Sequence, residues 1–376
     1  SRLIGLATLT VAGVLLGVGG CPQLLEQLLP NTDVQQKEET FKTSLHGTRQ
    51  GKTTWYSKEN GGFETLTGVP MDQLDCLNCH AKTLADGTPV DPETYQPSCA
   101  DCHVEPGDQV SQETCLGCHS RQGLEAKLFS DVHRDAGMVC TDCHSDREMH
   151  GDGNSYASLS AEGALDTKCE NCHKSSGGTA PLPDNTAHSI HMANVDCSAC
   201  HVQSVVSCAN CHFESEIAGG GKRFPGPLTG FVLLLRKADT GKVVTGTLMS
   251  LTYQGKTFAT LAPIYGHTVT AQARECPDCH NNANVQQYTE TGTIPLVTYD
   301  ESQNTLTGPQ GVVPVPPDWK TALTFDFMDY GGDPASTETD PSQWSFLKSG
   351  ADLLQMLFAE PLTDEQMQKL QTPMGG

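Results

Sequence analysis

The pentapeptide Cys-x-x-Cys-His occurs eight times in this chain and uses 16 of its 17 cysteines. Every Cys-x-x-Cys in the sequence is followed at once by histidine. The cysteines of the eight motifs are Cys76, Cys79, Cys99, Cys102, Cys115, Cys118, Cys140, Cys143, Cys169, Cys172, Cys197, Cys200, Cys208, Cys211, Cys276 and Cys279. The histidines that close them are His80, His103, His119, His144, His173, His201, His212 and His280. The fold must therefore bring two thiols and one imidazole together at each motif, where they can bind or react with a common group.

Disulfides, zinc ribbons and thioredoxin-like redox pairs all use the Cys-x-x-Cys spacing. None of them has a reason to place histidine directly after each pair, and histidine is only 14 of the 376 residues. Covalent haem attachment explains all three positions, because two thiols reach the vinyl groups of one porphyrin and the adjacent imidazole binds its iron. The sequence therefore predicts eight covalently attached c-type haems.

The spacing of the motifs predicts the fold class. All eight lie between residues 76 and 280, in a chain with 37% hydrophobic and 6% aromatic residues. Such a composition favours porphyrins over side chains as the main buried apolar surface. We expect a mainly α/irregular multihaem cytochrome c, with short helices and loops around a haem array. Residues 228–265 are rich in β-branched residues and predict a small antiparallel β insertion in this octahaem core.

The regions outside the motifs predict export and a haem-free tail. Residues 1–20 resemble a signal peptide, and "VGGC" resembles a lipobox that ends at Cys21, the one cysteine outside the motifs. We expect a lipid on Cys21 of an outer-membrane lipoprotein, in the periplasm or at the cell surface; an uncleaved anchor helix is the alternative. Residues 21–75 form an N-terminal segment, and residues 281–376 a haem-free extension with helical patterns over 343–360 and 363–370.

Six histidines remain after the eight proximal ones, and they are candidates for the sixth position on the irons: His46, His133, His150, His188, His191 and His267. Six spare histidines cannot serve eight irons, so at least two haems need another ligand or an open position. Met138, Met149 and Met192 are candidates for those positions, with apolar packing as the alternative role.

The stretch "VDCSACHVQSVVSCANCHFES", preceded by "HSIH", resembles the multihaem cytochrome c group related to octahaem tetrathionate reductase and hydroxylamine oxidoreductase. "SLHGTRQGKTTWYS" and "DVHRDAGMVCTDCH" extend the resemblance over roughly residues 41–280. The resemblance implies closely packed haem pairs and, in some members, catalysis at one unusually ligated haem. The chain lacks the Cys-x-x-Cys-Lys of related nitrite reductases, and no pattern singles out a distal lysine or a crosslinking tyrosine.

These features lead to three functional hypotheses. The first is electron transfer along a haem chain in anaerobic or extracellular respiration, with redox proteins or an external acceptor as partners and the membrane reached through a lipid. The second is an oxidoreductase that reduces a nitrogen or sulfur oxyanion at an open haem. The third is a subunit of a polymeric cytochrome wire. A formal charge of −22 argues against nucleic acid as a partner.

Overall fold

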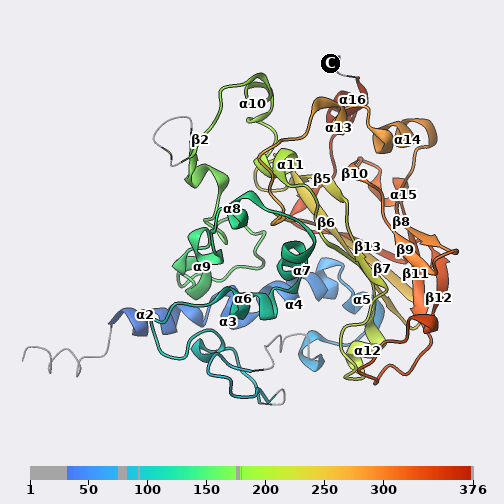
Figure 1. Ribbon diagram of the computed structural model, residues 1–376. Coiled ribbons are helices and arrows are strands. Elements are labelled where there is room, and N and C mark those ends of the chain that lie inside the picture. Colours follow the sequence, from blue (N-terminus) through green and yellow to red (C-terminus); the bar gives the residue numbers. More distant parts are fainter. Residues whose placement is uncertain (1–31, 75–82, 92–93, 175–177, 179, 374–376) are drawn as a thin grey trace, which may run out of the picture.

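The computed structural model describes the chain except for residues 1–31, 75–82, 92–93, 175–177, 179 and 374–376 (Figure 1). Two predictions lie outside the described residues: the signal peptide with Cys21, and the first haem motif with Cys76, Cys79 and His80. No helix among the residues that the structure describes is both long and apolar enough to cross a bilayer.

The first half of the chain forms short helices joined by loops, on the left of Figure 1. Polar N-caps start several of them: Ser111 accepts from the Thr114 N–H at 3.2 Å, and Asn185 from the His188 N–H at 2.9 Å. The α-helices are α2 (Thr32–Phe41), α3 (Leu45–Thr48), α4 (Gln50–Tyr56), α5 (Glu64–Thr67), α6 (Gln112–Cys118), α7 (Ser120–Leu128), α8 (Val132–Asp135), α9 (Asp146–His150), α10 (Thr186–His191) and α11 (Cys197–His201). A two-stranded ladder joins β1 (His173–Lys174) to β2 (Ala180–Pro181).

The second half is built on an eight-stranded mixed sheet. Its centre is an antiparallel meander of β5 (Phe231–Lys237), β6 (Val243–Tyr253) and β7 (Lys256–Pro263), so the prediction of antiparallel strands over residues 228–265 is confirmed locally. The sheet is much larger than that meander, however. It also contains β3 (Ser207–His212), β4 (Gly226–Leu228), β10 (Gly311–Pro314), β13 (Leu353–Met356) and β14 (Ala359–Glu360).

A second, four-stranded sheet runs in the order β12-β11-β8-β9 and lies on the right of Figure 1. Its strands are β8 (Ile294–Asp300), β9 (Thr305–Thr307), β11 (Leu323–Tyr330) and β12 (Trp344–Ser349). The helices of this half are α12 (Phe213–Ile217), α13 (Cys276–Cys279), α14 (Ala283–Thr291), α15 (Trp319–Ala322) and α16 (Asp364–Gln371).

One apolar core joins the two sheets. Leu233 and Leu248 of the larger sheet and Leu296, Phe325 and Phe327 of the smaller one all belong to it and are at most 2% exposed. The predicted fold class, a mainly α/irregular haem array with a small β insertion, is therefore wrong: the protein is a mixed α/β structure with two mixed sheets. The low hydrophobic content is misleading because the apolar residues are concentrated in these strands.

The C-terminal extension is part of the sheets. The helix predicted over residues 343–360 is wrong, because this stretch forms β12, β13 and β14. Its apolar residues meet a partner strand: β13 pairs in parallel with β7, and Gly350, at φ +85°, lies in the turn before it. The helix predicted after Thr363 is confirmed as α16, and the reciprocal Thr363–Gln366 capping box is present.

Candidate haem sites

Six of the described motifs form a single helical turn. In four of them the histidine N–H donates to the first cysteine's carbonyl, at 2.8–3.0 Å, in the motifs that begin at Cys99, Cys115, Cys140 and Cys276. The motif from Cys197 forms α11, and that from Cys169 opens with a 3₁₀ turn. Such a turn brings two thiols separated by two residues to the same side of the backbone.

An aspartate inside three motifs explains why the turn forms there. Asp101, Asp142 and Asp278 each precede the second cysteine of their motif. Each carboxylate accepts the backbone N–H three residues earlier, at 2.7–3.0 Å, and so closes the start of the turn. The cysteine geometry is therefore encoded locally, next to the cysteines.

The six spare histidines each face the histidine of a different motif. All six pairs have ring centroids 6.0–6.5 Å apart. The pairs are His46–His119, His103–His150, His133–His173, His144–His267, His188–His201 and His191–His280.

This separation fits two imidazoles on one iron. Iron–nitrogen bonds of about 2 Å on each face of a porphyrin, with about 1.1 Å from each nitrogen to its ring centre, put the two centres roughly 6 Å apart. The residues at these six sites therefore fit a haem held by two histidines.

The outer ring nitrogens of these histidines are held by the backbone. Nδ1 of His103, His201 and His280 lies 2.8–3.0 Å from a main-chain carbonyl oxygen. On the distal side, Nδ1 of His188 and His191 does the same at 2.8 and 3.0 Å. A carbonyl accepts only from a protonated Nδ1, so it fixes the tautomer whose Nε2 lone pair is available to a metal.

His46 shows the same preference for a neutral imidazole by a different route. The residue lies in α3, and burial lowers its pKa from 6.5 to about 4, with the nearby His119 and Arg49 acting in the same direction. A neutral ring is the form that ligates iron. The pair His46–His119 joins the N-terminal segment, predicted as a separate region, to the motif-bearing part.

Thiols of different motifs also lie beside one another. Burial and the neighbouring Cys140 thiol raise the pKa of Cys115 to about 11, and Cys102 adds to this effect. Burial and Cys172 raise the pKa of Cys143.

The same contacts continue toward the C-terminal motif. Hydrogen bonding to Cys197 raises the pKa of Cys169. Burial and Cys200 raise the pKa of Cys279 to about 12. Together these effects indicate neighbouring motifs and order six of them into one row, which runs through His103, His119, His144, His173, His201 and His280.

Apolar side chains stand exposed beside the motifs. Val104 directly follows His103 and is 58% exposed, and Ile190 and Met192 flank His191 at 55% and 44%. Such exposed apolar groups beside candidate ligands are consistent with an apolar group bound at these sites. Met192 is one of the methionines considered as a sixth ligand; at the six paired sites a histidine lies opposite the motif histidine instead.

The motif from Cys208 to His212 differs from the other described motifs because it lies in strand β3. Cys208 is in register with Met249 of β6 and Cys211 with Leu251, while His212 is in register with Thr252. The register shift between the cysteines and the positive φ of Asn210 mark a bulge. Both cysteines therefore project from one face of the sheet and His212 from the other.

His212 is also enclosed by protein groups. It is 5% exposed, and its Nδ1 lies 2.9 Å from the Ser215 hydroxyl. Its Nε2 lies 3.4 Å from Glu214 and 3.6 Å from a carboxylate oxygen of Asp329. These carboxylates occupy the space beside Nε2 that a porphyrin would need. The arrangement at this motif therefore does not fit a haem ligated by His212.

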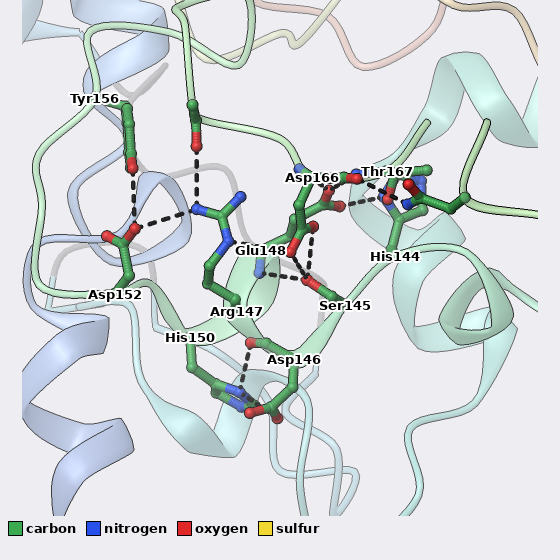
Figure 2. A network of polar contacts seen from close by, with 12 residues as sticks. His144, Ser145, Asp146, Arg147, Glu148, His150, Asp152, Tyr156, Asp166 and Thr167 are labelled. Atoms are coloured by element: carbon green, nitrogen blue, oxygen red, sulfur yellow. Dashed lines mark hydrogen bonds and ion pairs between the residues drawn. The ribbon is translucent and has the colours of Figure 1, made fainter. Parts of the chain in front are cut away.

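Two buried glutamates belong to the sites and were missed from the sequence. Glu148 Oε2 lies 2.6 Å from His144 Nδ1 (Figure 2), and Glu125 Oε2 lies 3.7 Å from His267 Nδ1. Glu148 follows His144 by four residues, a spacing that brings side chains together on a helix and could have indicated the contact. No local pattern links Glu125 to His267, which lies 142 residues further along the chain.

Within the described ranges, no group of three or more His, Cys, Asp or Glu side chains forms a metal site. Comparison with protein-family models, with curated proteins and with solved structures finds no match to this chain. The geometry of the sites is thus the basis for a functional assignment.

Proposed function

We propose that this protein is an exported multihaem c-type cytochrome that transfers electrons along a row of covalently held haems. One observation carries the proposal: each of six spare histidines faces the histidine of a different Cys-x-x-Cys-His motif, at 6.0–6.5 Å between ring centroids. Bound haem supplies one-electron redox chemistry, with a potential set by axial ligands, burial and hydrogen bonding.

The role of the protein at these sites is to hold both axial positions. The motif histidine provides one ligand, and a histidine from a distant segment provides the other. With both positions filled, a substrate has no vacant position to enter at these six sites. This favours electron transfer over oxyanion reduction as their role.

The order of the sites supports a conduit. The electrostatic influence of each motif's thiols on those of the next supports an order of six neighbouring motifs. Cysteine pairs that neighbour one another in this way would bring the haems attached to them close together. Among the motifs that the structure describes, the row runs from the Cys99 motif to the Cys276 motif beside α16.

Location and partners follow from the same proposal. Haem attachment to this motif takes place outside the bacterial cytoplasm, so the chain would act in the periplasm or at the cell surface, held by a lipid on Cys21. With a formal charge of −22, the protein would bind a basic surface of its redox partner, and this binding would weaken as the salt concentration rises. The acceptor is a second cytochrome or extracellular iron(III).

The proposal is tested by spectroscopy and kinetics on the mature protein. We expect covalent haem in the denatured protein and rapid reoxidation of the dithionite-reduced protein by iron(III) or a partner cytochrome. Turnover of nitrite, hydroxylamine or tetrathionate should be negligible. Sustained turnover of any of these at about 1 s⁻¹ or faster would instead support a reductase. Absence of covalent haem would refute the proposal as a whole.

A further inference from the structure

The His144–His267 pair is distinguished by buried carboxylates behind both of its rings. The Glu148 side chain is 1% exposed and its Oε2 lies 2.6 Å from Nδ1 of His144. The Glu125 side chain is 0% exposed and its Oε2 lies 3.7 Å from Nδ1 of His267. A buried carboxylate is costly unless it is paired or hydrogen-bonded.

Backbone N–H groups hold both carboxylates in place. Glu148 Oε1 accepts from the N–H groups of Asp166 and Thr167, each at 2.7 Å (Figure 2). Glu125 accepts from the N–H of Val206 at 3.2 Å and from the N–H of His267 at 2.9 Å. These four contacts fix the position of both carboxylates.

The surroundings of Glu148 keep it aimed at His144. Ser145 caps α9 through the Glu148 N–H at 3.3 Å and donates to Asp166 at 2.8 Å. Arg147 Nε donates to the same Asp166 carboxylate at 3.1 Å, which compensates its charge. Figure 2 shows Glu148 linked both to His144 and to the backbone of residues 166–167, so the carboxylate that contacts His144 is held in place.

No other described pair has this arrangement on both sides. Most of the other histidine Nδ1 contacts are to neutral carbonyl oxygens. Asp131 lies 3.6 Å from His133, but no carboxylate contact accompanies its partner His173. Asp146 lies 2.9 Å from His150, but its side chain is 62% exposed and it is paired with Lys37 at 3.2 Å.

We infer that Glu148 and Glu125 are positioning residues that give the His144–His267 site the lowest reduction potential of the six paired sites. Glu148, at 2.6 Å, accepts the Nδ1 proton of His144 and makes that imidazole a stronger donor, whereas Glu125, at 3.7 Å from His267 Nδ1, acts through its charge alone. Two negative charges beside the site favour the more positive, oxidised iron. The site is third in the row of six, so electrons crossing the protein pass through a low-potential step.

This inference rests on the proposed function, and its test uses the mature protein with its haems attached. A spectroelectrochemical titration of Glu148→Gln, Glu125→Gln and the double variant gives the potential of each haem. Glutamine keeps the size of the side chain and removes its charge. We expect one component, the lowest in the native protein, to move upward in each single variant and further in the double variant. The shift at Glu148 corresponds to about a tenfold change in the iron(III)/iron(II) equilibrium, or about 59 mV.

Asp146→Asn is the matched control, because it removes an exposed carboxylate next to a different ligand histidine. We expect a clearly smaller shift for this variant. An unchanged lowest component in both glutamate variants, or a shift no larger than that of Asp146→Asn, would overturn the inference. Haem content, measured on the same samples, separates this failure from failure of the proposed function. If one variant does not acquire haem, the variant at the other glutamate is measured instead, because Glu148 lies beside His144 and Glu125 beside His267.

Discussion

The motif-bearing part of the chain, taken here as residues 97–201, and the sheet-bearing part, from residue 202 onward, are stabilised in different ways. Between residues 97 and 201, the buried hydrophobic residues among those described are Ala164 and Ala199 alone. From residue 202 onward, one core joins two sheets through large side chains such as Phe325 and Phe327. The first part has polar caps and exposed apolar groups but no core of its own, so we expect bound haem to supply its apolar contacts. The second part resembles an ordinary globular domain.

The strongest test of this contrast is the fate of the two parts without haem. A chain expressed in the cytoplasm without residues 1–20 would acquire no haem. We expect it to keep slow amide exchange in β5, β6 and β11. Residues 97–192 should exchange at close to unfolded rates, because their opening free energy is about zero without haem. Hydrogen exchange with mass spectrometry measures both. Equal protection of the two parts would show that the motif-bearing part has sufficient contacts of its own.

A core substitution should affect the sheet-bearing part alone. Phe327 is 0% exposed, and Phe327→Ala is expected to reduce the unfolding free energy by about 3–5 kcal/mol through the cavity it leaves. Far-ultraviolet circular dichroism in denaturant measures this loss, while the Soret band of the haems should be unchanged. Phe346→Ala is the control, at a side chain 45% exposed, with an expected effect within about 0.5 kcal/mol.

The motif in strand β3 sharpens the comparison, because it lies in the sheet. Trypsin cuts after Lys174 and Lys222, so one peptide contains both the Cys197 and the Cys208 motifs. We expect this peptide to carry one haem and, after reduction, two alkylated cysteines. Peptide mass spectrometry gives the count. Two haems on the peptide would mean that β3 leaves its sheet position during maturation.

A small acid dependence is expected at the edge of the larger sheet. Burial of Asp352 favours its protonated form, but Lys348 at 2.6 Å and the Thr257 N–H at 2.8 Å hold its pKa below 3.8. A depressed folded pKa gives stability that is present above pH 3.8 and is lost as the pH falls below it. With the side chain 41% exposed, the loss should be about 0.5 kcal/mol. Melting temperatures at pH 5 and pH 3 should differ less in Asp352→Asn than in the native protein.

The sequence predicts local structure better than long-range contacts. The motif turns follow from Cys-x-x-Cys-His spacing with a capping aspartate, and α16 follows from its capping box. The partner of each histidine does not follow: His133 lies seven residues before Cys140 yet faces His173, and His46 faces His119. Proximity in sequence does not determine which ring shares a site.

The sheets were underestimated for a similar reason. The short run from Gly311 to Pro314 contains proline and belongs to a stretch that reads as a loop, but it pairs in parallel with β5, some 80 residues earlier. Residues 343–360 have helix-like apolar spacing, but strand partners in β7 and β11 override it. The buried glutamates were missed because their contacts are set by the fold.

The pairing of histidines is the central claim, and the spin state of the haems in His191→Ala tests it most directly. His191 faces His280 and is not deeply buried, so its removal should leave the fold intact and one iron without a sixth ligand. Electron paramagnetic resonance of the oxidised protein should show one additional high-spin haem, which binds carbon monoxide when reduced. His212→Ala, in the strand motif, should add none. An unchanged low-spin count in His191→Ala, or a new high-spin haem in His212→Ala, would contradict the account.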